Sequence, residues 1–309
     1  MCELLRKGVI GAFSCLMSSS VFRFVPECGQ PTTKNIREFV DVLSTIKHLV
    51  VMTGAGISTE SGIPDYRSPK VGQYARTDHR PVLHGDFMQS LTVRKRYWTR
   101  NYVAWPRFSA SQPNETHQTI ANWEKSERFT WLITQNVDGL HTAAGSKMLT
   151  ELHGCSRRVI CMNCHSLFSR EMIQEWIEKK NPNWCMEEIG ELAPDGDCNI
   201  SDKAVNNFNI PTCPNCGPES ILKTDVVFFG GFIAREVHNK CYKVVESCDG
   251  MLVLGSSLTV LSGCRYVQQA YEQSVPILIV TIGPTAADDL ATVKISAKCS
   301  DVIRHVPNL

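Results

Sequence analysis

Short apolar runs alternate along this chain with longer stretches in which apolar residues recur at helical spacing. The short runs have the length and composition of buried strands. They cover residues 48–53, 129–134, 225–229, 250–254 and 276–282. Strands that alternate with helices favour an α/β fold with a doubly wound, parallel, Rossmann-like sheet, in which ligands bind at the carboxyl ends of the strands.

The helical spacing predicts a first helix after Pro31, with Thr32 or Thr33 available as its cap. Its apolar positions are Ile36, Phe39, Val40, Leu43 and Ile46. Further helices are expected over about residues 115–126 and 263–273. Residues 70–110 are rich in Arg, Tyr, Trp and His but only weakly periodic, so loops and short helices are expected there.

The alternation of strands and helices disappears from about residue 155 to 216, which predicts a small inserted domain. The chain is expected to return to the large sheet near Lys223. The division that follows is a Rossmann-like domain made of residues 32–154 and 223–309, with a small domain over residues 155–222.

The first 26 residues differ in composition from the rest. They contain three basic residues, several serines, a single acid and an apolar run over residues 9–17. This composition favours a mitochondrial transit peptide over residues 1–26. A secretory signal and an unprocessed tail are the alternatives, and the cysteine pattern described next argues against secretion.

Four of the 14 cysteines form two matched C-x-x-C pairs, which predict a metal site in a reducing compartment. Cys161 and Cys164 make the first pair, and Cys213 and Cys216 make the second. Four thiolates close a tetrahedral zinc shell and leave no position open for a substrate, so one structural Zn²⁺ is expected. Two redox pairs are the alternative, and His165 is a possible substitute ligand.

Composition excludes several classes of partner. The chain has 309 residues, of which 43% are hydrophobic and 20% charged, as in ordinary globular enzymes. A net charge of +1 gives no reason to expect nucleic acid as a partner. No apolar run approaches the ~18 residues of a membrane span, so no membrane partner is expected either.

The first strand ends in a Gly-Ala-Gly turn, Gly54 to Gly56, of the kind that lets backbone N–H groups approach a pyrophosphate. Thr59 stands where the dehydrogenase fingerprint requires a third glycine, so the motif alone is weak. A long loop over residues 57–67 follows it and carries an acid and a base. A loop of this length favours a functional role over a simple strand–turn–helix connection.

Polar residues also follow the next strand, where Gln135, Asn136 and Asp138 are expected to face the ligand crevice. Asn and Asp favour turns, so Asn136 and Asp138 could have a purely structural role there. The larger amide of Gln135 does not stabilise a turn, which favours a functional role for it. Two histidines compete for the part of general base, because His141 and His153 are both near this edge and spacing cannot choose between them.

Taken in order, these motifs resemble the sirtuins, the NAD-dependent protein deacylases. The resemblance covers about residues 35–305. It rests on GAGIS, GIPDYR, TQNVDGLH, ELHG, the two cysteine pairs, VVFFG and GSSL. Residues 66–68 and 74–77 look most like the class II mitochondrial sirtuin, which implies the mitochondrial matrix.

The resemblance implies a reaction with NAD as co-substrate and an acyl-lysine of a protein as the second substrate. The acyl oxygen attacks the sugar as nicotinamide leaves, and His153 acts as general base on the ribose with Asn136 beside it. The products are lysine, nicotinamide and O-acyl-ADP-ribose. The NAD contacts implied are Gly54, Ala55, Gly56, Ser58, Asp65, Tyr66, Arg67, Tyr74, Gln135, Asn136, Val137, Asp138, Gly255, Ser256, Ser257, Thr281, Ile282, Gly283 and Cys299.

Alternatives to deacylation are mono-ADP-ribosyl transfer at the same site and a weakly catalytic NAD sensor. Three positions depart from the sirtuin pattern: Thr224 and Gly231 stand where a proline and an acid are usual, and Thr281 stands where an asparagine is usual. Altered peptide binding and weaker NAD binding are expected from these changes. Arg76, His79 and Arg80 either favour acidic acyl groups or form a solvated basic surface.

Overall fold

The computed structural model describes residues 21–77, 81–184, 193–198 and 205–306. A parallel sheet of six strands has the order β3-β2-β1-β7-β8-β9. Its strands are β1 (Leu49–Thr53), β2 (Trp131–Thr134), β3 (Leu149–Glu151), β7 (Gly250–Leu254), β8 (Ile277–Val280) and β9 (Val293–Ile295). The strand order reverses between β1 and β7, as in a doubly wound Rossmann fold, so the predicted fold class is confirmed.

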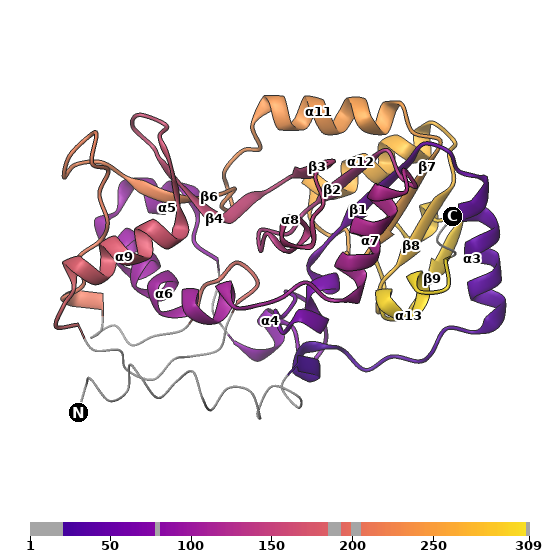
Figure 1. Ribbon diagram of the computed structural model, residues 1–309, viewed down its shortest axis with the longest axis horizontal. Coiled ribbons are helices and arrows are strands. Elements are labelled where there is room, and N and C mark those ends of the chain that lie inside the picture. Colours follow the sequence, from indigo (N-terminus) through magenta and orange to yellow (C-terminus); the bar gives the residue numbers. More distant parts are fainter. Residues whose placement is uncertain (1–20, 78–80, 185–192, 199–204, 307–309) are drawn as a thin grey trace.

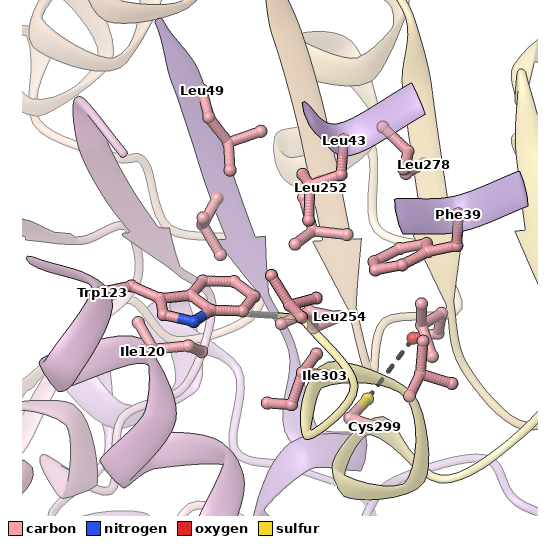
Figure 2. Close-up of a cluster of buried hydrophobic side chains, with 14 of the residues drawn as sticks. Phe39, Leu43, Leu49, Ile120, Trp123, Leu252, Leu254, Leu278, Cys299 and Ile303 are labelled. Carbon is pink, nitrogen blue, oxygen red and sulfur yellow. Dashed lines mark hydrogen bonds between the residues drawn. The ribbon is translucent and has the colours of Figure 1, made fainter. Parts of the chain in front are cut away.

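Helices cover both faces of this sheet (Figure 1). One face packs against α3 (Thr33–Thr45), α7 (Glu115–Lys125) and α13 (Cys299–Ile303), and the other against α11 (Arg235–Glu246) and α12 (Leu261–Glu272). Between the sheet and the first of these two helix layers, buried apolar side chains of helices and strands form one cluster (Figure 2). Burial of this kind contributes ~25 cal/mol per Å² of apolar surface and fixes the sheet rigidly.

The helix predicted after Pro31 is α3, and its start is explained by a capping box. The Thr32 hydroxyl accepts from the Asn35 backbone N–H at 3.1 Å, while the Asn35 side chain accepts from the Thr32 backbone N–H. Phe39 and Leu43 point into the core (Figure 2). The helices expected near residues 115–126 and 263–273 are α7 and α12.

A second, smaller sheet is antiparallel and has the order β5-β4-β6. It consists of β4 (Gly154–Cys161), β5 (Leu167–Ser169) and β6 (Leu222–Val226), and it packs with α5 (His84–Gln89), α6 (Leu91–Ser109) and α9 (Arg170–Lys180). These elements are called the small lobe below. It lies beside the large sheet in Figure 1.

Two sequence expectations about this part are wrong. The chain does not rejoin the large sheet near Lys223, because Lys223 pairs with Ile160 of β4 in the smaller sheet. Residues 91–109 form one long helix, α6, rather than short pieces. Its periodicity is obscured because polar Thr99 and Asn101 are buried along with the aromatic residues, and Asn101 accepts from the buried Arg170 at 2.7 Å.

Arg158 of β4 joins the two lobes. Its guanidinium donates to Glu151 of β3 at 2.7 Å and to Asp225 of β6 at 2.9 Å. One side chain of β4 therefore links the last residue of β3 in the large sheet to β6 of the smaller sheet. The intervening residues 152–153 lie at the junction, which fixes the position of the histidine there.

The remaining elements are short. They are η1 (Val21–Phe24), η2 (Ala55–Ser61), α4 (Gln73–Arg76), α8 (Leu140–Ala144) and η3 (Asp288–Leu290). Most of the predicted transit peptide, residues 1–20, lies outside the described residues, as do His79 and Arg80. In the described ranges, no helix combines the length and apolarity that a bilayer crossing needs.

Candidate active site at the carboxyl edge of the sheet

A cavity of about 1010 Å³ opens at the carboxyl ends of the parallel strands. The loops that follow β1, β2, β3, β7 and β8 all contribute to its wall, and the small lobe closes the other side. The predicted site residues that line it are Gly54, Ala55, Gly56, Ser58, Asp65, Tyr66, Arg67, Gln135, Asn136, Val137, Asp138, His153, Gly255, Ser256, Ser257, Thr281, Ile282 and Gly283. A space of this size at a strand-order reversal fits an extended dinucleotide.

The glycines of the Gly-Ala-Gly turn serve a close approach between two loops. A Cβ on Gly56 would lie 2.7 Å from the Gly255 carbonyl oxygen, and one on Gly54 would lie 2.7 Å from Ser256 Cβ. The Gly56 N–H donates to that same Gly255 oxygen at 2.8 Å. The glycines therefore bring the ends of β1 and β7 together, and this requirement holds whether or not a phosphate also lies there.

Asn136, Ser58 and Asp138 form one buried hydrogen-bond network in the cavity wall. The Asn136 amide donates to Gly54 O and to Ser58 Oγ, both at 3.1 Å. Ser58 Oγ donates to Asp138 Oδ2 at 2.7 Å, and Asp138 Oδ1 accepts from the Leu140 N–H at 2.9 Å. Rotation of any of these side chains would break a buried hydrogen bond, so the network holds them rigidly.

Asp65 organises the loop that follows η2. Its Oδ1 accepts from the backbone N–H groups of Arg67 and Ser68 at 3.0 and 2.8 Å, and its carbonyl accepts from the Gln73 N–H at 2.7 Å. Tyr74, unlike Asp65, does not line the cavity. Its ring lies 5.7 Å from that of Tyr66 and beneath the Arg67 guanidinium, so it supports the loop from behind.

His153 lies where β3 leads into β4, and the cavity reaches its ring. Its Nδ1 lies 2.9 Å from the Gln135 carbonyl oxygen. Because a carbonyl can only accept, the ring proton belongs on Nδ1, and Nε2 keeps its lone pair. Burial lowers the pKa of His153, and the bond to Gln135 offsets only part of that shift. A neutral imidazole with its lone pair on Nε2 can remove a proton once a substrate hydroxyl reaches that nitrogen.

The rival histidine, His141, is a core residue. It is 2% exposed, its Nε2 lies 2.9 Å from Thr53 Oγ1, and its ring lies 4.8 Å from that of His117. Burial lowers the pKa of His141 to about 3. It does not line the cavity, whereas His153 does. The structure therefore favours His153 as the general base, a choice that the sequence spacing left open.

Gln135 bridges two strand ends, since its Nε2 donates to Ser256 Oγ at 2.8 Å. Cys299 lies near the end of β8. It does not line the main cavity, its thiol donates to the Val280 carbonyl at 3.4 Å, and burial raises its pKa. It lines a smaller cavity next to Thr281 and Ile282, at the end of β8.

Of the three departures from the sirtuin pattern, Gly231 and Thr281 line the cavity and Thr224 does not. Thr224 is fully buried and its hydroxyl hydrogen-bonds to Tyr97 in the small lobe. Arg76 also lies outside the cavity wall, where its guanidinium covers the Phe24 ring. Arg76 is therefore not placed to bind an acidic acyl group inside the cavity.

The sequence did not identify two parts of the cavity wall. Ser262 at the start of α12 donates its hydroxyl to His153 Nε2 at 2.8 Å. Residues 25–29 reach the wall from the amino-terminal side, whereas residues 226–231, which leave the smaller sheet along the opening, include the predicted VVFFG motif. A serine in the first turn of a helix carries no distinguishing signal, and Pro and Gly near residue 26 read as linker.

The four predicted cysteines meet in the small lobe. Cys161 Sγ lies 3.9 Å from Cys216 Sγ, Cys164 Sγ lies 3.7 Å from Cys213 Sγ, and all four lie within 4.8 Å of one another. Sulfurs at ~2.3 Å from a tetrahedral zinc would stand ~3.8 Å apart. The cluster therefore fits one structural zinc, and His165 is not part of it.

Comparison with known proteins agrees with this geometry. A human protein named NAD-dependent protein lipoamidase sirtuin-4, mitochondrial, is 49% identical over 285 residues, which are 92% of this chain and 90% of the relative. The Caenorhabditis elegans protein named NAD-dependent protein deacylase sir-2.2 is 49% identical over 286 residues, covering 92% and 99% of the two chains.

Two solved structures show the same fold. A Sir2 protein with a deacetylated p53 peptide and 3'-O-acetyl ADP-ribose has a TM-score of 0.69 and 28% identity, covering 88% of this chain and 97% of that one. A Sir2 complex with a p53 peptide and NAD⁺ gives a TM-score of 0.67 with 27% identity, over 88% and 96%. The sequence profile of the Sir2 family matches residues 54–262. The chain belongs to the Sir2 family.

Proposed function

We propose that this protein is an NAD-dependent protein-lysine deacylase that releases nicotinamide and forms O-acyl-ADP-ribose. The observation that carries the proposal is the neutral His153 imidazole, whose Nε2 lone pair faces a cavity at the carboxyl edge of a Rossmann-like sheet. Membership of the Sir2 family and relatives named deacylases support the same conclusion.

Bound NAD would supply the electrophilic sugar carbon and the nicotinamide leaving group. The residues of this chain would bind and orient it. The network of Ser58, Asn136 and Asp138 supports a role in holding the nicotinamide ribose and carboxamide, because these side chains are already fixed by one another. His153 would take the proton of a ribose hydroxyl through Nε2.

Ser262 holds the position that a ribose hydroxyl must take. Its hydroxyl donates to His153 Nε2 at 2.8 Å, so the substrate hydroxyl has to replace it before His153 can act as a base. A serine in the first turn of α12 can rotate away from the ring at little cost. We assign Ser262 the role of keeping the lone pair of His153 hydrogen-bonded while the cavity waits for its substrate.

We also propose that the preferred acyl group is a long, uncharged chain and that the protein acts in mitochondria. Human and bovine relatives are named lipoamidases, and a lipoyl chain is long and uncharged. Apolar side chains of Ile63, Val82, Tyr97 and Phe228 line this cavity, which suits such a chain. The mitochondrial names of those relatives support a mitochondrial location, and we propose the matrix.

We further propose that the chain divides functionally into two parts: a Rossmann-like NAD-binding part and a zinc-binding small lobe. The zinc would hold together the segment that carries one wall of the acyl-lysine entrance. Mono-ADP-ribosyl transfer is not favoured, because the relatives carry deacylase and lipoamidase names.

Mass spectrometry of the products tests the proposal. The full chain is incubated with NAD and lysine peptides that carry acetyl, lipoyl or glutaryl groups. We expect O-acyl-ADP-ribose, nicotinamide and free lysine in equal amounts, with the lipoyl peptide turning over faster than the glutaryl peptide. His153→Ala should remove turnover while its far-ultraviolet circular dichroism matches the parent. ADP-ribose attached to protein, with no acyl-ADP-ribose formed from any peptide, would reject deacylation.

A further inference from the structure

The chain before the first helix forms part of the wall of the main cavity. Val25, Pro26, Glu27, Cys28 and Gly29 all line it, although they belong to no sheet and to neither of the described lobes. None of the motifs of the reaction lies in this stretch. Residues 24–29 are called the N-terminal strap below.

The strap is anchored on the loop that Asp65 organises. Phe24 is 6% exposed, and the Arg76 guanidinium carbon lies 4.7 Å from its ring centroid. Arg76 Nε in turn donates to the Val71 carbonyl at 2.8 Å, and Val71 lines the cavity. The short helix η1, which ends at Phe24, packs against η2, which begins within the Gly-Ala-Gly turn.

The strap also reaches the far end of the cavity. Pro26 lines both the main cavity and the smaller one at the end of β8, where it shares the wall with Gly56, Thr281, Ile282 and Cys299. The same short segment therefore shares cavity walls with the loop after β1, the loop around residues 65–71 and the residues after β8. These are three of the pieces that would surround a dinucleotide at a strand-order reversal.

From these contacts we propose that the N-terminal strap is one wall of the dinucleotide site, and that tight NAD binding depends on it. The proposal rests on the proposed function, since it takes NAD as the occupant. It also revises the processing boundary drawn from the sequence. A cut after residue 26 would remove Phe24, Val25 and Pro26, so a mature chain that binds NAD tightly has to begin upstream of Phe24.

The first test uses the thiol of Cys28 in the unmodified full chain. Iodoacetamide alkylation of each cysteine is followed by peptide mass spectrometry, with and without saturating NAD. Cys28 is partly exposed and lines the cavity, so NAD should slow its alkylation severalfold. Cys264 is also partly exposed but does not line the cavity, and its rate should stay unchanged.

The second test measures NAD affinity by calorimetry in Phe24→Ala. Loss of the buried anchor should raise the NAD Kd by roughly tenfold. Leu167→Ala, at an exposed position of β5 outside the cavity wall, is the matched control and should bind NAD like the parent. Circular dichroism and the melting temperature show whether Phe24→Ala keeps its fold, and the Cys28 measurement needs no variant.

The outcomes separate the two proposals. If the parent chain binds NAD but Cys28 is alkylated at the same rate with and without it, the strap is not part of the site and the inference is wrong. The same holds if folded Phe24→Ala binds NAD as tightly as the parent. If the parent chain binds no NAD in calorimetry, the proposed function fails and takes the inference with it.

Discussion

At the scale of single residues, backbone geometry decides which atom of the histidine can act as a base. The Gln135 carbonyl accepts from His153 Nδ1 and thereby leaves Nε2 for the substrate side. Burial keeps the ring neutral, because removing the imidazolium from water costs more than the single carbonyl contact returns. Protonation state and orientation therefore come from the same few contacts.

The direction of the His153 pKa shift predicts the pH dependence of the reaction. Only the neutral ring can accept a proton, and a lowered pKa keeps it neutral at more acidic pH. The acid limb of kcat/KM should therefore have its midpoint below the ordinary histidine value of about 6.5, with a plateau at neutral pH.

Ser262→Ala is the comparison for this profile. It removes the hydroxyl on Nε2 and not the base, so it should keep an acid limb and change kcat/KM far less than His153→Ala. A midpoint well above 7 in the parent chain, or turnover in His153→Ala equal to the parent, would exclude His153 as the base.

The sequence predicts which residues lie at the site better than it predicts what each of them contacts. Close approach by a phosphate at Gly54 and Gly56 stays a prediction, and the structure adds a second requirement, which is their contact with the loop after β7. That contact joins residues about 200 positions apart, and spacing within one motif cannot reveal it. Tyr74 supports Tyr66 and Arg67 and does not line the main cavity, because a motif match gives a position and not a direction. Cys299 lines the smaller cavity at the end of β8.

At the scale of secondary structure, the carboxyl ends of parallel strands gather the site. Each of β1, β2, β3, β7 and β8 ends in a loop that reaches the cavity. The sequence predicted most of these strands from apolar runs alone, because fully buried strands leave a continuous signal. The strand predicted over residues 225–229 of the large sheet is instead β6, Leu222–Val226, of the smaller sheet, since an apolar run does not tell which sheet a strand joins.

The two cysteine pairs hold the small lobe together through one zinc site. Cys161→Ser should abolish zinc binding and destabilise the small lobe, because structural zinc contributes on the order of 10 kcal/mol to the folding of small domains. Zinc content by atomic spectroscopy should fall from one per chain to none, and the melting temperature should drop.

Cys264→Ser is the matched control, since this cysteine lies on α12 outside the cluster. It should keep one zinc and melt like the parent. Should Cys161→Ser remain soluble, free of zinc and as heat-stable as the parent, the metal would not be structural.

At the scale of the whole molecule, the cavity lies between the carboxyl edge of the large parallel sheet and the small lobe. Arg158 ties the lobes together through Glu151 and Asp225 at the point where His153 lies between them. The base is thereby fixed relative to both the sheet edge and the entrance formed by residues 226–231. Sequence motifs predicted these parts but not the Arg158 ion pairs, which depend on the pairing between β4 and β6.

The most direct test of this account is a crystal structure of the full chain with NAD and an acyl-lysine peptide. The account predicts the dinucleotide along the carboxyl edge of the sheet, with His153 Nε2 about 3 Å from a ribose hydroxyl that has replaced Ser262. A His153 ring turned away from the ribose, with no hydrogen-bonded path to it, would contradict the account.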